Sequence, residues 1–411
     1  MLVIHDTATR REHTASQMTS RLYYTDAYAT AFDGRITDVS ADGQRVYLDQ
    51  TAFYPTSGGQ PYDVGSLGDS QVADVVDEDE RVAHVLTAPL SGHAIGDTVR
   101  GTIDWARRFD HMQQHTGQHL LSAVFADLFG YETVSVHFGA ERSSLDLDVG
   151  AIDAAQLGDA ERRANEIVWQ NRPVSVGFED ASTAAGLRKP PPRAGTLRIV
   201  TIAELDRSAC GGTHVRATGE IGAITLRGME RIRKQTRVEF LCGVRVVRQA
   251  RADFEALSAI ALSVKASLTE APALVAAQSA ELRDTAAARK RLEGELAVHQ
   301  ARALYDMTAA TSGGVRVAVL RRDGGSLEEI RPFAQAFAAL PKTVFVAAVL
   351  SPPTVLVAAA DDSGVDAGKL LKPALAAAGG RGGGSPRLAQ GTVPNADALE
   401  DAVNAIRFGV A

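Results

Sequence analysis

Cysteine is scarce in this chain, because only Cys210 and Cys242 occur among its 411 residues. Two cysteines in unrelated contexts do not form a disulfide framework. No stretch approaches the roughly 20 consecutive apolar residues of a membrane span. Residues 1–20 are polar and of mixed charge, unlike a signal peptide. These absences argue against an integral membrane protein and a disulfide-stabilised secreted domain, and they predict a cytoplasmic protein with reduced thiols.

An excess of positive charge is also missing, since the formal net charge is −7. This balance argues against a surface that is basic all over, but total charge is a weak guide to local sites. One short segment does concentrate basic residues, namely Arg227, Arg231, Arg233, Lys234 and Arg237. We interpret it as either an RNA contact or a solvated strand edge, and the last four residues are the RNA-binding candidates.

Metal-ligating side chains occur in two short motifs, HTGQH at 115–119 and CGGTH at 210–214. Residues 105–129 lack proline and precede Gly130, which predicts a helix with a glycine C-cap. His115 and His119 are four residues apart and therefore share one face of that helix. The two glycines of the second motif predict a tight loop whose backbone freedom turns Cys210 and His214 to one point.

A thiolate with imidazoles suits zinc better than magnesium or calcium. Either motif alone is weak, but the pair, in a chain with so little cysteine, predicts a zinc site. His111 lies one turn before His115 and leaves three alternatives: a ligand in place of His119, a group behind the ligands, or a partly exposed histidine at the start of a helix. Cys242 lies in the apolar run 238–247, which predicts a buried structural thiol.

The chain divides by composition into five parts. A leader covers 1–21; short apolar runs at 22–104 predict a small antiparallel β-barrel or sandwich. Helices and strands then mix in 105–247, an Ala-, Leu- and Glu-rich segment at 248–307 predicts a pair of antiparallel helices, and 308–411 alternates strand and helix. The predicted fold class is therefore α+β, with a zinc-containing domain between the barrel and a helical arm.

Two glycine-rich segments have two interpretations each. The sequence FYPTSGGQP at 53–61 is either a turn or a backbone that lies close to a ligand, and the turn is favoured. The segment 379–384, which contains Arg381, either lies against a phosphate backbone or forms a flexible turn.

In combination these motifs carry a resemblance. HTGQHLLSA and SACGGTH, preceded by FYPTSGGQPYDVG, resemble the editing domain of alanyl-tRNA synthetase and its free-standing relatives, the AlaX proteins. LYYTDAY at 22–28 is similar to the start of AlaX proteins, and VDAGKLL with GGRGGGSPRLAQG looks like the DHHA1 domain of the long forms. The tail departs from the family pattern, because Gln390-Gly391 is followed by Thr392-Val393 rather than by glycines.

The resemblance implies a function and a set of residues. The family hydrolyses the ester of mischarged tRNA(Ala), removing serine or glycine, and its DHHA1 domain supports tRNA binding and dimerisation through the C-terminal half. No ATP-binding signature precedes the barrel, so aminoacylation is not expected. The resemblance implies that the zinc ligands of this chain are His115, His119, Cys210 and His214. It implies that the substrate pocket contains Ser57, Gly58, Gly59 and Gln60. It also implies that the RNA-contacting loop contains Arg381, Gly382 and Gly383.

The implied mechanism has one difficulty, since four protein ligands fill a tetrahedral zinc site and such sites are normally structural. Either the zinc becomes five-coordinate, or a ligand is displaced, or the zinc mainly positions the amino acid. Thr116 is the candidate catalytic residue, because a site that bonds the serine hydroxyl rejects substrates that lack it. Two other functions stay open: a zinc-stabilised tRNA-binding protein without catalysis, and a metallohydrolase of a small ester.

Overall fold

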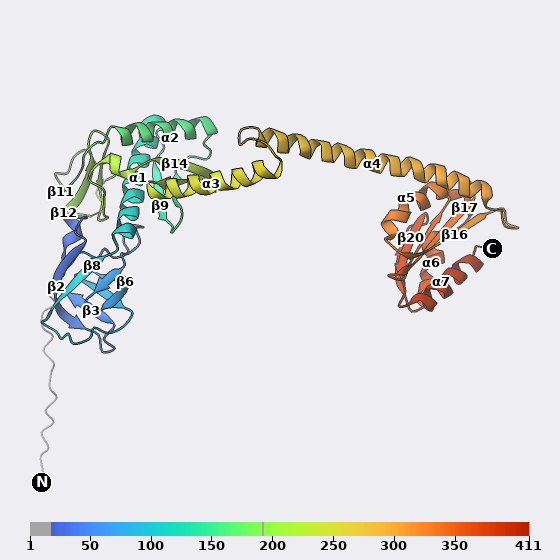
Figure 1. The fold of residues 1–411 in the computed structure, drawn as a ribbon, viewed down its shortest axis with the longest axis horizontal. Coiled ribbons are helices and arrows are strands. Elements are labelled where there is room, and N and C mark those ends of the chain that lie inside the picture. The colour runs from blue at the N-terminus through green and yellow to red at the C-terminus, as the bar shows by residue number, and fades with distance from the viewer. Residues whose placement is uncertain (1–17, 191–192, 411) are drawn as a thin grey trace, which may run out of the picture. The chain divides into compact units, whose positions relative to one another are not determined.

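The computed structural model describes residues 18–190 and 193–410, and the chain divides into two compact units, Met1–Leu257 and Ser258–Ala411 (Figure 1). Most of the predicted leader lies outside the described residues. Its last two residues form β1 (Ser20–Arg21), which pairs in parallel with β4 (Gln50–Thr51). In the described part of the chain, no helix combines the length and apolar character needed to cross a membrane.

The first unit begins with a closed six-stranded barrel, so the barrel alternative was right and the sandwich alternative was wrong. Alternation of buried and exposed residues, clearest along Thr98–Ile103, fills the barrel interior with apolar side chains such as Phe32, Ile36 and Leu48. The strand order is β2 (Ala31–Val39), β3 (Arg45–Leu48), β7 (Arg81–Leu86), β6 (Ser70–Glu78), β5 (Gly65–Leu67) and β8 (Thr98–Ile103).

Helix α1 (Trp105–Phe129) follows the barrel and is the central element of the unit. Asp104 caps its N-terminus, and Gly130, at φ 69°, caps its C-terminus in the left-handed region, as predicted. Every residue from 111 to 125 is buried, including glutamines. Their amides are satisfied internally: Gln114, for example, bonds both the N–H and the C=O of Cys242.

Two antiparallel sheets and a second helix complete this unit. One sheet has the order β14 (Ile224–Ile232), β15 (Gln235–Cys242), β10 (Ser143–Leu147) and β9 (Thr133–Phe138), and α2 (Ala154–Trp169) packs with α1 and β14. The other has the order β11 (Val174–Asp180), β12 (Thr196–Ile202) and β13 (Asp206–Ala209). Strands β11 and β13 were not predicted from the sequence.

The helical segment contains two helices, α3 (Val244–Ser263) and α4 (Ala271–Met307), as predicted; their antiparallel packing stays a prediction. In the second unit, a five-stranded sheet has helices on both faces. Ala301 of α4 and Phe337 of α5 pack on one face, and Leu371 of α6 and Leu399 of α7 on the other. The elements are β16 (Arg316–Gly324), α5 (Leu327–Ala338), β17 (Thr343–Ser351), β18 (Thr354–Ala359), α6 (Ala367–Ala377), β19 (Arg381–Gly384), β20 (Leu388–Thr392) and α7 (Ala396–Phe408).

The glycine-rich tail corrects one alternative, because Arg381–Gly384 is not a flexible turn but the edge strand β19, paired with β20. Close packing requires glycine at Gly382, where a Cβ would lie 2.4 Å from the Gln390 carbonyl oxygen, and at Gly391 of β20, where one would lie 2.2 Å from Leu375. Both contacts are shorter than real Cβ atoms show. A Cβ on Gly383 would meet nothing within 4 Å, so packing does not explain that glycine.

Candidate metal centre

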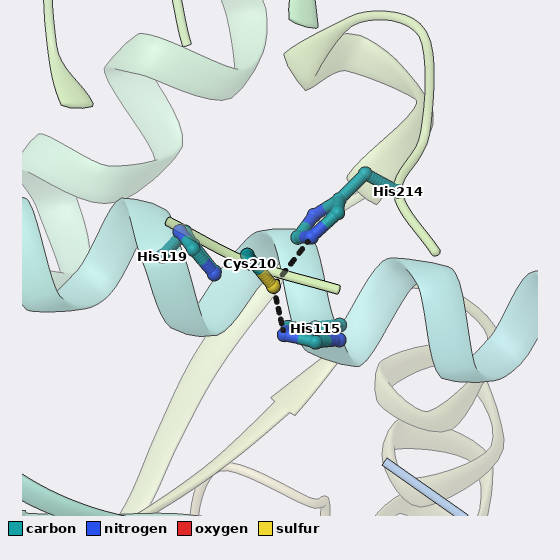
Figure 2. A group of neighbouring side chains, drawn as sticks. All are labelled: His115, His119, Cys210 and His214. Atoms are coloured by element: carbon teal, nitrogen blue, oxygen red, sulfur yellow. Dashed lines mark hydrogen bonds between the residues drawn. The ribbon is translucent and has the colours of Figure 1, made fainter. Parts of the chain in front are cut away.

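Four side chains from two distant segments meet at one point in the first unit. His115 and His119 come from α1, and Cys210 and His214 come from the loop after β13 (Figure 2). Their ligand atoms all lie within 4.8 Å of one another. Cys210 Sγ is 3.3 Å from His115 Nε2 and 3.4 Å from His214 Nε2. Sulfur and nitrogen ligands of one tetrahedral zinc lie about 3.5 Å apart, so the cluster fits the predicted metal.

Each imidazole is held at its other nitrogen. His115 Nδ1 lies 2.8 Å from Gln60 Oε1, His119 Nδ1 lies 3.0 Å from Asp206 Oδ2, and His214 Nδ1 lies 3.1 Å from Thr116 Oγ1. Such contacts fix the tautomer that leaves Nε2 free for a metal. The arrangement therefore has the outer hydrogen bonds that metal-binding histidines need, in addition to the four ligands.

The charges at two of the four side chains, Cys210 and His214, also suit a metal. At His119, burial would lower the pKa, but the hydrogen bonds and charges of Asp206 and Cys210 raise it to about 9. Burial alone would raise the pKa of the Cys210 thiol, but the charges of His115 and His214 and hydrogen bonds lower it well below its usual value. Burial, followed by repulsion from His115, lowers the pKa of His214 to about 3. A thiolate and a neutral imidazole are the forms that bind metal.

Asp206 holds the second histidine and is itself held. Arg188 Nε donates to its Oδ1 at 2.7 Å, and the Ser208 hydroxyl donates to the same carboxylate. Burial would raise the pKa of Asp206, but the bonds and charges of His119 and Arg188 lower it. Neither Asp206 nor Arg188 was predicted from the sequence; the position of Asp206, four residues before Cys210, was the available signal.

The segment Ser57–Gln60 forms a tight turn, so the favoured interpretation was right. Ser57 and Gln60 bond each other's backbone, and Gly58 and Gly59 adopt φ of 56° and 84°. Positive φ at both central residues is the geometry that pairs of glycines supply in two-residue hairpins. The turn leaves Ser57, Gly58 and Gly59 exposed and buries Gln60, whose amide also bonds the N–H and hydroxyl of Thr213.

A buried ion pair, which sequence reasoning also missed, anchors this segment to α1. Arg108 Nε donates to Asp63 Oδ1 at 3.0 Å, and its terminal nitrogens donate to the carbonyls of Ala27 and Ala52. The Tyr54 N–H donates to Asp63 Oδ2 at 2.6 Å. Both charged side chains are fully buried. The barrel and the helix are thereby fixed to each other beside the metal cluster.

The glycines of the cysteine loop serve a different purpose from the one predicted. Neither Gly211 nor Gly212 has a positive φ. Instead, a Cβ on Gly212 would lie 2.1 Å from His115 Cε1. Any side chain at this position would therefore collide with a metal ligand, and the need for glycine comes from close approach.

The remaining predicted residues lie as follows. Thr116 is fully buried, and its hydroxyl contacts His214 and accepts from the Val215 N–H; its contact with an aminoacyl group stays a prediction. The metal cluster includes His119 and not His111, which is 6% exposed rather than partly exposed. Cys242 is buried against Gly117, as predicted, and burial raises its pKa above the usual range.

The RNA-binding candidates divide into three groups. Arg231, Arg233 and Lys234 lie exposed at the tip of the β14–β15 hairpin. Arg237 is instead paired with Asp146, with Nε 2.7 Å from Oδ1. Arg381, Gly382 and Gly383 lie exposed on β19 of the second unit.

Comparison with known proteins shows which families these features resemble. Residues 197–238 match the threonyl and alanyl tRNA synthetase second additional domain, 314–408 match the DHHA1 domain, and 6–107 match class II (A) tRNA synthetases. The alanyl-tRNA editing protein AlaX-L of Pyrococcus horikoshii is 29% identical over 390 residues, which cover 92% of this chain and 95% of that protein. Over nearly its whole length, this chain is therefore similar to an alanyl-tRNA editing protein.

Other relatives match over part of their own length. The alanyl-tRNA editing protein Aarsd1 of Bos taurus is 38% identical over 212 residues, which cover 50% of this chain and 47% of that protein. An alanine–tRNA ligase of Methanoregula boonei is 33% identical over 405 residues, or 94% of this chain and 43% of the ligase. The chain thus spans less than half the length of these two relatives. The match to class II synthetases covers residues 6–107, and the described part of this range contains the barrel and the start of α1.

Proposed function

We propose that this chain hydrolyses the ester bond of tRNA(Ala) mischarged with serine, and also with glycine, at a zinc ion held by the four-residue cluster. The observation that carries the proposal is the convergence of His115, His119, Cys210 and His214 with Gln60 from the glycine-rich turn. These residues come from the family's separate motifs, and the fold brings them to one place.

The donor set favours zinc over harder cations, because three imidazoles and a thiolate are its preferred ligands. When bound, zinc supplies a positive centre that polarises a carbonyl and lowers the pKa of water. The protein's own residues position that centre. Gln60, Asp206 and Thr116 each hold one histidine. Ser57, Gly58 and Gly59 are exposed on the glycine-rich turn, and we place the amino acid beside them.

Thr116 acts in this proposal through His214. Its hydroxyl already contacts the imidazole and the Val215 N–H, and its side chain is fully buried. This geometry supports a role in orienting a metal ligand more than direct contact with the serine hydroxyl. Thr116 is therefore a positioning residue.

The second unit serves to hold the tRNA. Arg381, Gly382 and Gly383 on the exposed edge strand β19, and the basic tip of the β14–β15 hairpin, are the proposed RNA contacts. A homodimer through the C-terminal half accompanies this role, supported by exposed apolar residues on α4 such as Leu282, Leu292 and Leu296. Light scattering of the full chain tests it, and a monomer at micromolar concentration contradicts it.

One assay tests the function. The purified protein is mixed with Ser-tRNA(Ala), Gly-tRNA(Ala) and Ala-tRNA(Ala), and released amino acid is followed over time. Rapid release of serine, slower with alanine, is the expected result. Tight tRNA binding without release would mean a non-catalytic binding protein, whereas release from small seryl esters without tRNA affinity would mean a simple metallohydrolase.

A further inference from the structure

A hollow lies beside the N-terminal half of α1, and none of the four residues of the metal cluster lines it. It has a volume of about 460 Å³ and lies where α1, the residue Ala140 after β9, and the start of α3 meet. Its polar lining comes from Arg107, Asp110 and His111 of α1 and from Arg245 and Arg248 of α3. All of these residues belong to the first unit.

His111 is the unusual residue of this hollow. Its side chain is 6% exposed, yet among the described residues its Nδ1 has no hydrogen-bond partner. The neighbouring buried polar side chains of α1 differ, because Gln113, Gln114 and His115 all bond protein groups. A buried polar atom without a partner destabilises the fold, so its presence needs an explanation such as a ligand.

The charge of the hollow is positive. Three arginines face one carboxylate, so the lining carries an excess of two positive charges. Arg245 Nη2 bonds Asp110 at 2.7 Å, and Arg107 Nε donates to the Tyr62 carbonyl. Arg248 is exposed and has no ion pair in the part of the chain that the structure describes. Burial, followed by the charge of Arg107, lowers the pKa of His111 to about 4, so its imidazole is neutral and donates one N–H.

The hollow lies close to the metal cluster. His111 precedes His115 by four residues of α1, which is about 6 Å along a helix. Tyr62, which Arg107 contacts, follows Gln60 by two residues. On the other side, the Phe138 ring packs 5.2 Å from the His115 ring, and Ala140, two residues later, lines the hollow.

We propose that this hollow binds a backbone phosphate of the RNA substrate, near the end that carries the ester. Guanidinium groups bind phosphate oxygens through paired hydrogen bonds, and the imidazole of His111, which lines the hollow, offers a further donor. The proposal rests on the proposed function, because that function puts the RNA end at the neighbouring metal cluster. An RNA whose ester is there brings its last phosphates to the side of α1 on which this hollow lies.

Arg248 provides the first test, because it is exposed and no hydrogen bond or ion pair among the described residues ties it to the fold. Arg248→Ala should weaken tRNA binding about tenfold at low salt, and it should reduce the slope of log affinity against log salt by about one. Arg251→Ala is the matched control, since Arg251 is exposed on the same helix but does not line the hollow. Equal affinities and slopes for the two variants would overturn the proposal.

His111→Phe provides the second test, and its two readouts move in opposite directions. Phenylalanine keeps the ring and removes the unpartnered nitrogen, so the melting temperature should stay the same or rise. The affinity for tRNA should nevertheless fall several-fold. A variant that melts lower and binds tRNA normally would mean that His111 is structural and that the proposal is wrong.

A phosphate-free substrate separates this inference from the proposed function. Adenosine esterified with serine at its ribose should be hydrolysed equally by the unaltered protein and by Arg248→Ala. If the unaltered protein hydrolyses neither this ester nor Ser-tRNA(Ala), the proposed function fails. If it hydrolyses both and Arg248→Ala binds tRNA normally, only the phosphate site fails. In that case, inorganic phosphate could still inhibit the unaltered protein but not Arg248→Ala. That result would mean that the hollow binds a free anion, and it would overturn the RNA proposal.

Discussion

His111 and His115 lie one turn apart on the same buried helix, but the surroundings of their imidazoles differ. His115 has Gln60 at one nitrogen and Cys210 at the other. His111 has an open hollow lined by arginines and a nitrogen without a partner among the described residues. The hydrogen bonds of His115 are complete within the protein, which suits a permanently bound ligand such as a metal ion. His111 has a nitrogen without a partner among the described residues, which suits a ligand that binds and dissociates.

Removal of a ligand from the complete cluster should have the largest effect. Cys210→Ala deletes the thiolate and should lower metal content and deacylation more than about 100-fold, beyond the range seen for outer partners. Metal analysis and single-turnover assays measure both. A metal-free protein that is folded and still fully active would show that the cluster has no catalytic role. The contrast between His115 at a catalytic metal and His111 at a phosphate site would then be wrong.

Loss of an outer contact should have the next largest effect. Gln60→Leu removes the acceptor for His115 Nδ1 and should weaken metal binding roughly 10- to 100-fold. His111→Phe is the control, because it changes the neighbouring histidine and should leave metal affinity unchanged. Equal loss of metal by Gln60→Leu and His111→Phe would show that the contact between Gln60 and His115 has no special role in metal binding.

Thr116→Val should have a smaller effect of the same kind. It removes the hydroxyl beside His214 Nδ1 and should slow release of serine and alanine alike, by about tenfold. The ratio of the two rates is the informative measurement. A constant ratio supports the positioning role, and a loss of discrimination against alanine would restore direct contact between Thr116 and the serine hydroxyl.

The smallest effects concern the β14–β15 hairpin. Arg237 is ion-paired with Asp146 there, whereas Lys234 at the tip is exposed. Arg237 hydrogen bonds lower the pKa of Asp146 to about 2, so this pair stabilises the fold fully above pH 4 and the contribution disappears as the pH falls toward 2. Arg237→Ala should cost about 1 kcal/mol of unfolding free energy at pH 7 and little near pH 2.

Lys234→Ala is the partner experiment at the hairpin tip. Lys234 is exposed, so its loss should change the unfolding free energy by less than about 0.5 kcal/mol. It should instead lower tRNA affinity by a few-fold. Urea denaturation and tRNA titration distinguish the two variants, and an unstable Lys234→Ala would remove the distinction between them.

The sequence predicted the features that depend on local chemistry. Helix α1 was predicted with its observed bounds, because Gly130 and the absence of proline mark its limits. The barrel, as one of two alternatives, and the clustering of the four His and Cys side chains also followed, since alternating apolar residues and metal-ligating motifs are local signals. The short strand β13 carries no such signal, because four residues with one buried side chain have little periodicity.

The outer contacts could not be predicted in this way. Gln60 precedes His115 by 55 residues, and Asp206 follows His119 by 87, so neither pair is visible before the chain folds. The same holds for Arg108 and Asp63. His111 looked like an ordinary surface histidine because its burial depends on α3 and on the turn after β9, which come from elsewhere in the chain.

Gly212 has a practical consequence. Since a Cβ there would lie 2.1 Å from His115 Cε1, Gly212→Ala retains every metal-binding atom but displaces one of them. Such a protein should recognise its RNA with normal affinity while turnover stops. It would give crystallographers and kineticists a stalled complex in which the intact ester could be observed.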